Sequence, residues 1–162
     1  MPDIKTAIEM ILPDQSYILE LDEKRQVSML LHETTHQWAA YVDFIDENGK
    51  RSDSLRTPYL GRVHWNKKLE TGYDPLGGYS WIDNGNGTFT AKPVDPDRLG
   101  YSNLTLYLMG LISKSEVGPI KLIISDRDES TFGPEYTISG TLKTISIQQI
   151  IDAEGERECF LP

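Results

Sequence analysis

The stretch that decides the fold of this chain is Leu30-Leu31-His32-Glu33-Thr34-Thr35-His36-Gln37-Trp38, which contains the pattern H-E-x-x-H. Helical positions four apart lie above one another on one face, so the rings of His32 and His36 can grip one ion. Two neutral imidazoles supply half of a tetrahedral zinc shell, with Zn–N bonds of about 2.0–2.1 Å. The Glu33 carboxylate can hold a metal-activated water and take its proton. The stretch therefore predicts a Zn²⁺ site with hydrolytic chemistry.

The predicted motif helix carries an apolar arc on the side opposite the histidines. A wheel of 100° per residue collects Val27, Leu30, Leu31, Trp38, Tyr41, Val42 and Ile45 on it. We expect the helix to start at an N-cap on Asp22, to end at Asn48-Gly49 and to face the core with this arc. Ala39 and Ala40, on the histidine side, are small enough to let a metal ion and a substrate approach. Two histidines that share a helix face without a metal are the competing explanation.

A zinc site of this kind needs a third protein ligand. The metzincin continuation would place Gly at 39 and His or Asp at 42, but the chain has Ala39 and Val42. The thermolysin-type solution fails as well, because no N-E-x-x-S-D-like run follows the motif. Neither familiar pattern therefore supplies the ligand.

His64, in Gly61-Arg62-Val63-His64-Trp65, is the first choice for the third ligand. Glu116, Glu70 and Asp74 stay open as alternatives, because a ligand from a distant part of the chain follows no spacing rule. His64 could also contact the substrate or support the metal ligands beside a core tryptophan.

The rest of the chain mixes short helices and strands. A short helix is expected around Ile4–Ile11, a strand or lead-in at Tyr17–Leu21, and irregular structure from Ser52 to Leu76. Segments 78–82 and 88–91 predict a hairpin around Asp83-Asn84-Gly85-Asn86-Gly87, which is favoured as a plain turn over a calcium loop.

The C-terminal half alternates in the same way. Ser102 can cap a helix with a core stripe of Leu104, Leu108, Leu111 and Ile112. Segments 120–125 and 136–142 predict strands, and Thr144 or Ser146 caps a final helix. We therefore expect an α+β fold.

Tyr107 lies on the predicted helix after Ser102 and points away from its core stripe. A tyrosine that faces a zinc cleft can donate a hydrogen bond to the oxyanion of a tetrahedral intermediate. Tyr107 is therefore a candidate catalytic residue beside Glu33, with core packing as the alternative.

Composition limits the function classes. The chain has 162 residues, enough for one domain, and a net charge of -9 that disfavours nucleic acid and anionic lipid. No basic segment followed by an apolar one opens the chain, and no apolar run approaches the length of a membrane span. Neither a signal peptide nor a membrane span is expected. Cys159 is the only cysteine, so no internal disulfide is possible.

Several motifs resemble a largely uncharacterised bacterial family of zincin-like (HExxH) metallopeptidase domains. They are Leu31–Trp38, His64-Trp65, Trp81–Thr90, Tyr101–Leu111 and Gly140–Ile151, which together span most of the chain. The resemblance implies a zinc-dependent endopeptidase fold, often part of a larger exported protein, so residues 1–162 would be one such domain excised from a longer chain. In this family the position of Thr105 is usually Asp. If that acid orients the metal in relatives, the activity of this chain would be weakened.

The sequence thus predicts an α+β, zincin-like domain, with an active-site helix packed on a small mixed or antiparallel sheet. The expected activity is that of a zinc metalloendopeptidase, with metal ligands His32, His36 and His64 and catalytic residues Glu33 and Tyr107. Its partner would be a peptide or protein substrate. The alternatives are a degenerate, inactive interaction module and a zinc hydrolase of non-peptide amides. Substrate specificity, oligomeric state and compartment are not encoded in recognisable motifs.

Overall fold

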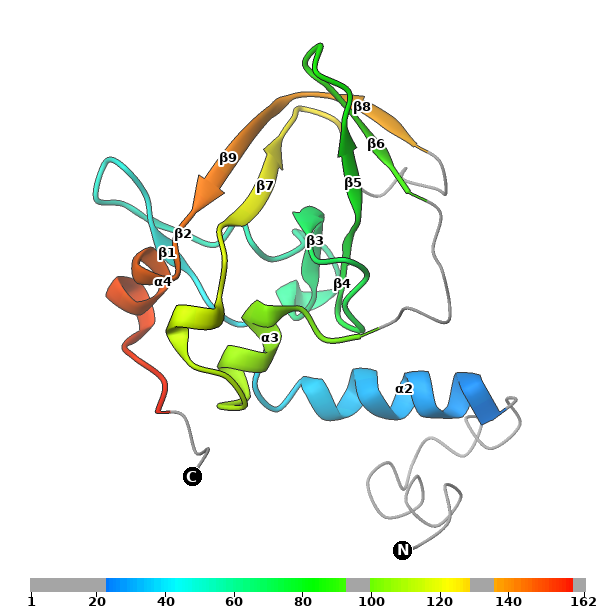
Figure 1. The fold of residues 1–162 in the computed structure, drawn as a ribbon, viewed down its shortest axis with the longest axis vertical. Coiled ribbons are helices and arrows are strands. Elements are labelled where there is room, and N and C mark those ends of the chain that lie inside the picture. Colours follow the sequence, from blue (N-terminus) through cyan, green and yellow to red (C-terminus); the bar gives the residue numbers. More distant parts are fainter. Residues whose placement is uncertain (1–22, 93–99, 129–135, 159–162) are drawn as a thin grey trace, which may run out of the picture. The chain divides into compact units, whose positions relative to one another are not determined.

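The computed structural model describes residues 23–92, 100–128 and 136–158 (Figure 1). The chain divides into two compact units, Met1–Gln37 and Trp38–Pro162, and each is described by itself. Helix α2 (Glu23–Thr35) is the described element of the first unit. The helix predicted around Ile4–Ile11, the segment Tyr17–Leu21 and the cap at Asp22 lie outside the described residues.

The second unit mixes helices and strands, which confirms the α+β prediction. Its helical segments are η2 (Leu60–Arg62), α3 (Asn103–Leu108), η4 (Lys114–Glu116) and α4 (Ile147–Glu154). Its strands are β1 (Phe44–Ile45), β2 (Arg51–Ser52), β3 (Trp65–Glu70), β4 (Gly77–Tyr79), β5 (Trp81–Asp83), β6 (Thr88–Ala91), β7 (Ile120–Ile124), β8 (Thr137–Ser139) and β9 (Thr141–Ile145).

The strands form three small sheets. Their orders are β1-β2, β4-β3-β7-β9 and β5-β6-β8. All pairs are antiparallel except β3 with β4, so the four-stranded sheet is mixed. In Figure 1 strand β9 runs antiparallel to β7 and leads into α4, which packs beside β1.

Two of the sheets share a continuous stretch of chain at Gly140. The stretch is β8 before this residue and β9 after it, and these strands belong to different sheets. A Cβ at Gly140 would lie 2.5 Å from the backbone oxygen of Ile124 and 2.9 Å from a methyl carbon of Ile123. Only glycine therefore lets the chain turn from one sheet into the other at this point.

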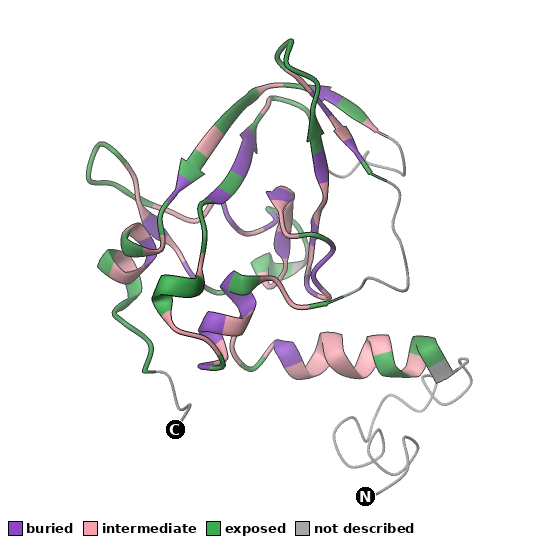
Figure 2. Cartoon of the chain, in the orientation of Figure 1, coloured by how far each residue is buried: buried purple, intermediate pink, exposed green. Residues whose placement is uncertain are grey.

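The buried side chains of the second unit form two clusters, whose residues are purple in Figure 2. The larger cluster is built around Trp65, Leu69 and Leu122. The smaller one contains Trp81, Phe89, Ala91, Ile123 and Ile138. Because neighbouring strand residues point to opposite faces, Leu122 and Ile123 of β7 enter different clusters. Strand β7 thus holds both clusters together.

The motif helix is shorter than predicted, because it ends at Thr35 and not at Asn48-Gly49. The backbone N–H of Gln37 donates to the carbonyl of Thr34, and Ala40 has a left-handed φ of 64°. The N–H of Gln37 thus bonds three residues back instead of four as the helix ends, and the left-handed Ala40 prevents the helix from resuming. Phe44 and Ile45 instead form β1, and Asn48-Gly49 lies in the loop from β1 to β2.

The predicted apolar arc is therefore wrong beyond the helix end. Val42 is buried next to a strand, whereas Tyr41 is 44% exposed and Val27, on the helix itself, is 39% exposed. Ala39 and Ala40 do not lie on the histidine side of a helix: both are fully buried in the larger cluster of the second unit. A helical wheel does not apply to residues beyond the end of the helix, because their side chains no longer follow the 3.6-residue period.

Local predictions in the second unit were more accurate. The hairpin is confirmed, with Trp81 paired to Ala91 and Asp83 to Phe89, but its predicted first strand at 78–82 is divided between β4 and β5, which belong to different sheets. Ser102 accepts a hydrogen bond from the N–H of Thr105 as the N-cap of α3, and Ser146 caps α4 together with Gln149.

Other boundaries differ. Helix α3 ends at Leu108, and Leu111 is 45% exposed, so the predicted core stripe stops early. The segment predicted to be irregular contains β3, and the strand predicted at 136–142 is divided at Gly140. Within the described ranges, no helix has the length and apolar character needed to cross a membrane.

Candidate metal centre

The two histidines of the motif meet at the C-terminal end of α2. The Nε2 atoms of His32 and His36 lie 3.3 Å apart, and the rings are nearly perpendicular, with 88° between their planes and 4.9 Å between their centroids. This convergence follows from the four-residue spacing, because the last turn of the helix carries His32 and the turn after it carries His36. Both rings are partly buried.

The distance between these nitrogens fits a shared zinc ion. In a tetrahedron with Zn–N bonds of about 2.05 Å, two ligand nitrogens lie about 3.3–3.4 Å apart. A hydrogen bond between two neutral rings, one donating and one accepting, accounts for the same distance. The geometry therefore suits a metal and also has a metal-free explanation.

The Thr35 side chain bonds to the helix backbone close to both histidines. Its hydroxyl donates a hydrogen bond of 2.5 Å to the carbonyl oxygen of Leu31, and its side chain is fully buried. A threonine that bonds back by four residues satisfies its own hydroxyl in the helix. This bond spans the turn that carries both His32 and Glu33.

The electrostatics of the pair favour a neutral imidazole. Burial lowers the pKa of His36 below its ordinary value of 6.5, and the neighbouring His32 lowers it further. Glu33 acts in the opposite direction and raises the pKa of His36. A neutral ring keeps a lone pair available, which is the form of histidine that binds a metal.

His64 belongs to the second unit, two residues after η2 and directly before β3. Its carbonyl oxygen accepts a hydrogen bond from the N–H of Thr57, and the next residue, Trp65, donates its N–H to Leu76. The Trp65 side chain is 1% exposed. The backbone on both sides of His64 is thus fixed, which presents its imidazole from a rigid support.

The three acids that were open as alternative ligands are already used as backbone acceptors. Glu70 accepts the N–H of Gly72 and of Trp81, one on each carboxylate oxygen. Asp74 accepts the N–H of Leu76 and of Ser102 in the same way and is 4% exposed.

Glu116 completes a capping box with Ser113 at η4, and this contact lowers the pKa of Glu116. The three histidines predicted as metal ligands are each partly buried, His32 and His36 in the first unit and His64 in the second.

Tyr107 is a core residue of the second unit. Its side chain is 2% exposed, and its hydroxyl accepts a hydrogen bond of 2.9 Å from the N–H of Arg157. It does not point away from the core, as the predicted helix wheel required. The hydroxyl still has a proton to donate, so its catalytic role stays a prediction.

Sequence reasoning missed a buried polar pair beside His64. The indole Nε1 of Trp65 donates to the hydroxyl of Thr105, a contact between residues 40 positions apart. No spacing rule links such residues, and only the residue types, a tryptophan and a hydroxyl, could have suggested the bond.

Comparison of the chain with models of protein families, with curated proteins and with solved structures finds no match.

Proposed function

We propose that this chain is a zincin-like, zinc-dependent metallopeptidase that hydrolyses peptide bonds in a protein or peptide substrate. The observation that carries the proposal is the 3.3 Å approach of the His32 and His36 Nε2 atoms, with a glutamate next to the first histidine. Two imidazoles at a distance suited to tetrahedral zinc, and an acid beside them, are the parts that this hydrolysis needs.

The proposed third ligand is His64. Support comes from its partly buried ring, its fixed backbone and the engagement of Glu70, Asp74 and Glu116 with backbone N–H groups. Imidazole is also the ligand type already present in the pair, and three histidines form a known catalytic zinc set.

Glu33 is the proposed general base and acid. Bound zinc would act as a Lewis acid and bring the pKa of a coordinated water toward about 7. The Glu33 carboxylate would accept the proton of the attacking water and pass it to the leaving amine nitrogen. Glu33 is partly buried, which allows contact with a substrate while limiting competition from bulk water.

The deciding experiment compares the wild type with Glu33→Gln. We expect about one zinc per chain by elemental analysis in both proteins, with cleavage of casein by the wild type only. Glu158→Gln, which makes the same chemical change at an exposed residue, is the matched control and should cleave normally.

Three outcomes would count against the proposal. A protein that binds no zinc would leave the histidine pair with the metal-free hydrogen bond. A wild type that binds zinc but cleaves no peptide would instead identify an inactive interaction module, and cleavage of small amides alone would identify a different zinc hydrolase.

A further inference from the structure

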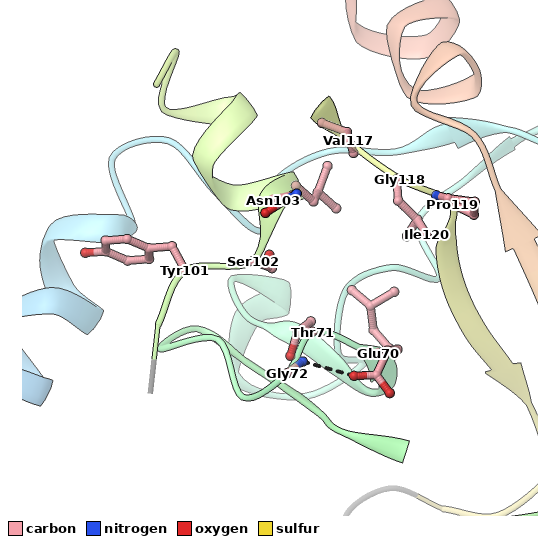
Figure 3. A pocket seen from close by; sticks show the side chains of 12 residues that line it. Glu70, Thr71, Gly72, Tyr101, Ser102, Asn103, Val117, Gly118, Pro119 and Ile120 are labelled. Carbon is pink, nitrogen blue, oxygen red and sulfur yellow. Dashed lines mark hydrogen bonds between the residues drawn. The ribbon is translucent and has the colours of Figure 1, made fainter. Parts of the chain in front are cut away.

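A cavity of about 380 Å³ lies in the second unit, and no histidine is among the residues that line it. It opens between the end of β3, the start of α3 and the segment that leads into β7 (Figure 3). Its volume falls within the range of small-ligand pockets. The apolar part of its wall includes Leu69, Leu104, Val117 and Ile120.

Glu70 is the only charged residue among those that line this cavity. Figure 3 shows the Glu70 side chain at the end of β3, with the hydrogen bond from the N–H of Gly72 as a dashed line. Oε1 accepts the N–H of Gly72 at 3.1 Å, and Oε2 accepts the N–H of Trp81 at 2.6 Å. A carboxylate offers about four acceptor sites, so both oxygens can accept a further hydrogen bond.

No ion pair to this carboxylate is found within the described parts of the chain, although Lys121 lies opposite Glu70 on the neighbouring strand β7. The ion pairs found there involve other acids: Asp43, Asp53, Glu47, Glu154 and Glu156. Lys121 lines a smaller neighbouring cavity together with Glu70, without an ion pair between them. A carboxylate fixed by two backbone donors and set among aliphatic walls is preorganised for a cation.

We propose that this cavity binds the side chain of a lysine or arginine in a peptide. The aliphatic stem of such a residue would pack on the apolar wall while its charged end pairs with Glu70. The net charge of -9 adds a long-range attraction for cationic peptides.

This site is separate from the proposed metal centre and does not rest on it. Glu70 ends β3, six residues after His64, and none of the proposed metal ligands lines the cavity. The cavity would therefore hold a lysine or arginine side chain whether or not zinc is bound.

The test uses the full chain and two probes, N-acetyl-lysine N-methylamide and its norleucine counterpart, which lacks the charge. Nitrogen–proton NMR spectra would follow the backbone amides of Gly72 and Trp81, because these groups bond directly to Glu70. We expect saturable shifts at both amides with the lysine probe, and none with the norleucine probe.

Three variants locate the site. Glu70→Gln should weaken lysine binding by about tenfold or more, because a hydrogen bond to a charged acceptor is lost. Gly118→Leu should place a side chain in the cavity, which Gly118 lines, and leave Glu70 intact. The protein should tolerate this change, since a Cβ at Gly118 meets no atom within 4 Å. Asp126→Asn removes the same charge at an exposed position outside the cavity, and its affinity should match the wild type.

The amide spectrum of each variant would show whether it folds. If Glu70→Gln does not fold, Gly118→Leu still tests the proposal. Equal shifts with both probes would overturn the proposal. So would undiminished binding in Gly118→Leu, or an equal loss of affinity in Asp126→Asn and Glu70→Gln.

Discussion

The indole Nε1 of Trp65 donates a hydrogen bond of 3.1 Å to the hydroxyl of Thr105, and both side chains are almost completely buried. Thr105 also bonds to Ser102, the N-cap of α3. Thr105 therefore supplies the acceptor for Trp65, the residue next to His64, and links this tryptophan to the start of α3.

Thr105→Val should lower the free energy of unfolding by about 1–3 kcal/mol, because it leaves a buried indole N–H without an acceptor. Thr105→Ser retains the hydroxyl and should lose less, with only a methyl group removed. Urea unfolding of the three proteins measures the difference. Equal stability of the valine variant and the wild type would show that the bond contributes nothing.

His64→Ala should raise the dissociation constant for zinc by at least about a hundredfold, because loss of a ligand exceeds the 10–100-fold typical of residues that only support one. Competition with a chromophoric chelator measures this constant. Glu70→Gln and Glu116→Gln are the matched controls, since both acids serve backbone N–H groups. If either control lost more affinity than His64→Ala, the ligand assignment would have to change.

Tyr107→Phe should lower stability by about 1 kcal/mol, because the N–H of Arg157 loses its acceptor while Arg157 stays exposed to water. We expect kcat for casein cleavage to stay within a few-fold of the wild type. A fall in kcat of about a hundredfold or more, with KM unchanged, would instead assign the hydroxyl to the oxyanion. Thermal unfolding and steady-state kinetics separate these results.

Asp74→Ala should cost about 2–4 kcal/mol of stability, because the buried N–H groups of Leu76 and Ser102 lose their acceptors. Burial raises the pKa of Asp74 above its usual 3.8, although hydrogen bonds from Ser102 and Leu76 oppose the shift. The folded protein therefore holds this proton more tightly than the unfolded chain does.

The contribution of Asp74 to stability is consequently largest below its unfolded pKa and decreases as the pH rises through its folded pKa. Unfolding of the wild type and Asp74→Ala across this acid range should show the advantage of the wild type shrinking with pH. A growing advantage would mean that the hydrogen bonds outweigh burial and lower the pKa.

The sequence predicted features that depend on neighbouring residues. The caps at Ser102 and Ser146 and the hairpin between Trp81 and Ala91 follow from local hydrogen-bonding groups and turn residues. The 3.3 Å approach of His32 and His36 likewise needs only helical spacing.

Features that depend on distant partners were missed. Strand β3 has only Trp65 and Leu69 buried, and a spacing of four residues fits one face of a helix and one face of a strand equally well. Its partners β4 and β7 decide its conformation. The end of the motif helix was missed for a related reason: Val42 and Ile45 fit the helical wheel, and only the pairing of β2 with β1 makes Phe44 and Ile45 a strand.

The turn at Gly140 has a consequence for folding cooperativity. One uninterrupted stretch of chain forms an edge strand in each of two sheets, β8 in one and β9 in the other. Unfolding of one sheet should therefore destabilise the other. The amide hydrogens of Ile138 and Leu142 should then exchange with solvent deuterium at closely similar opening free energies, as expected of a single cooperative unit. Gly140→Ala would lower both values together, because its methyl group collides with the backbone oxygen of Ile124, at the end of β7, right at the junction of β8 and β9.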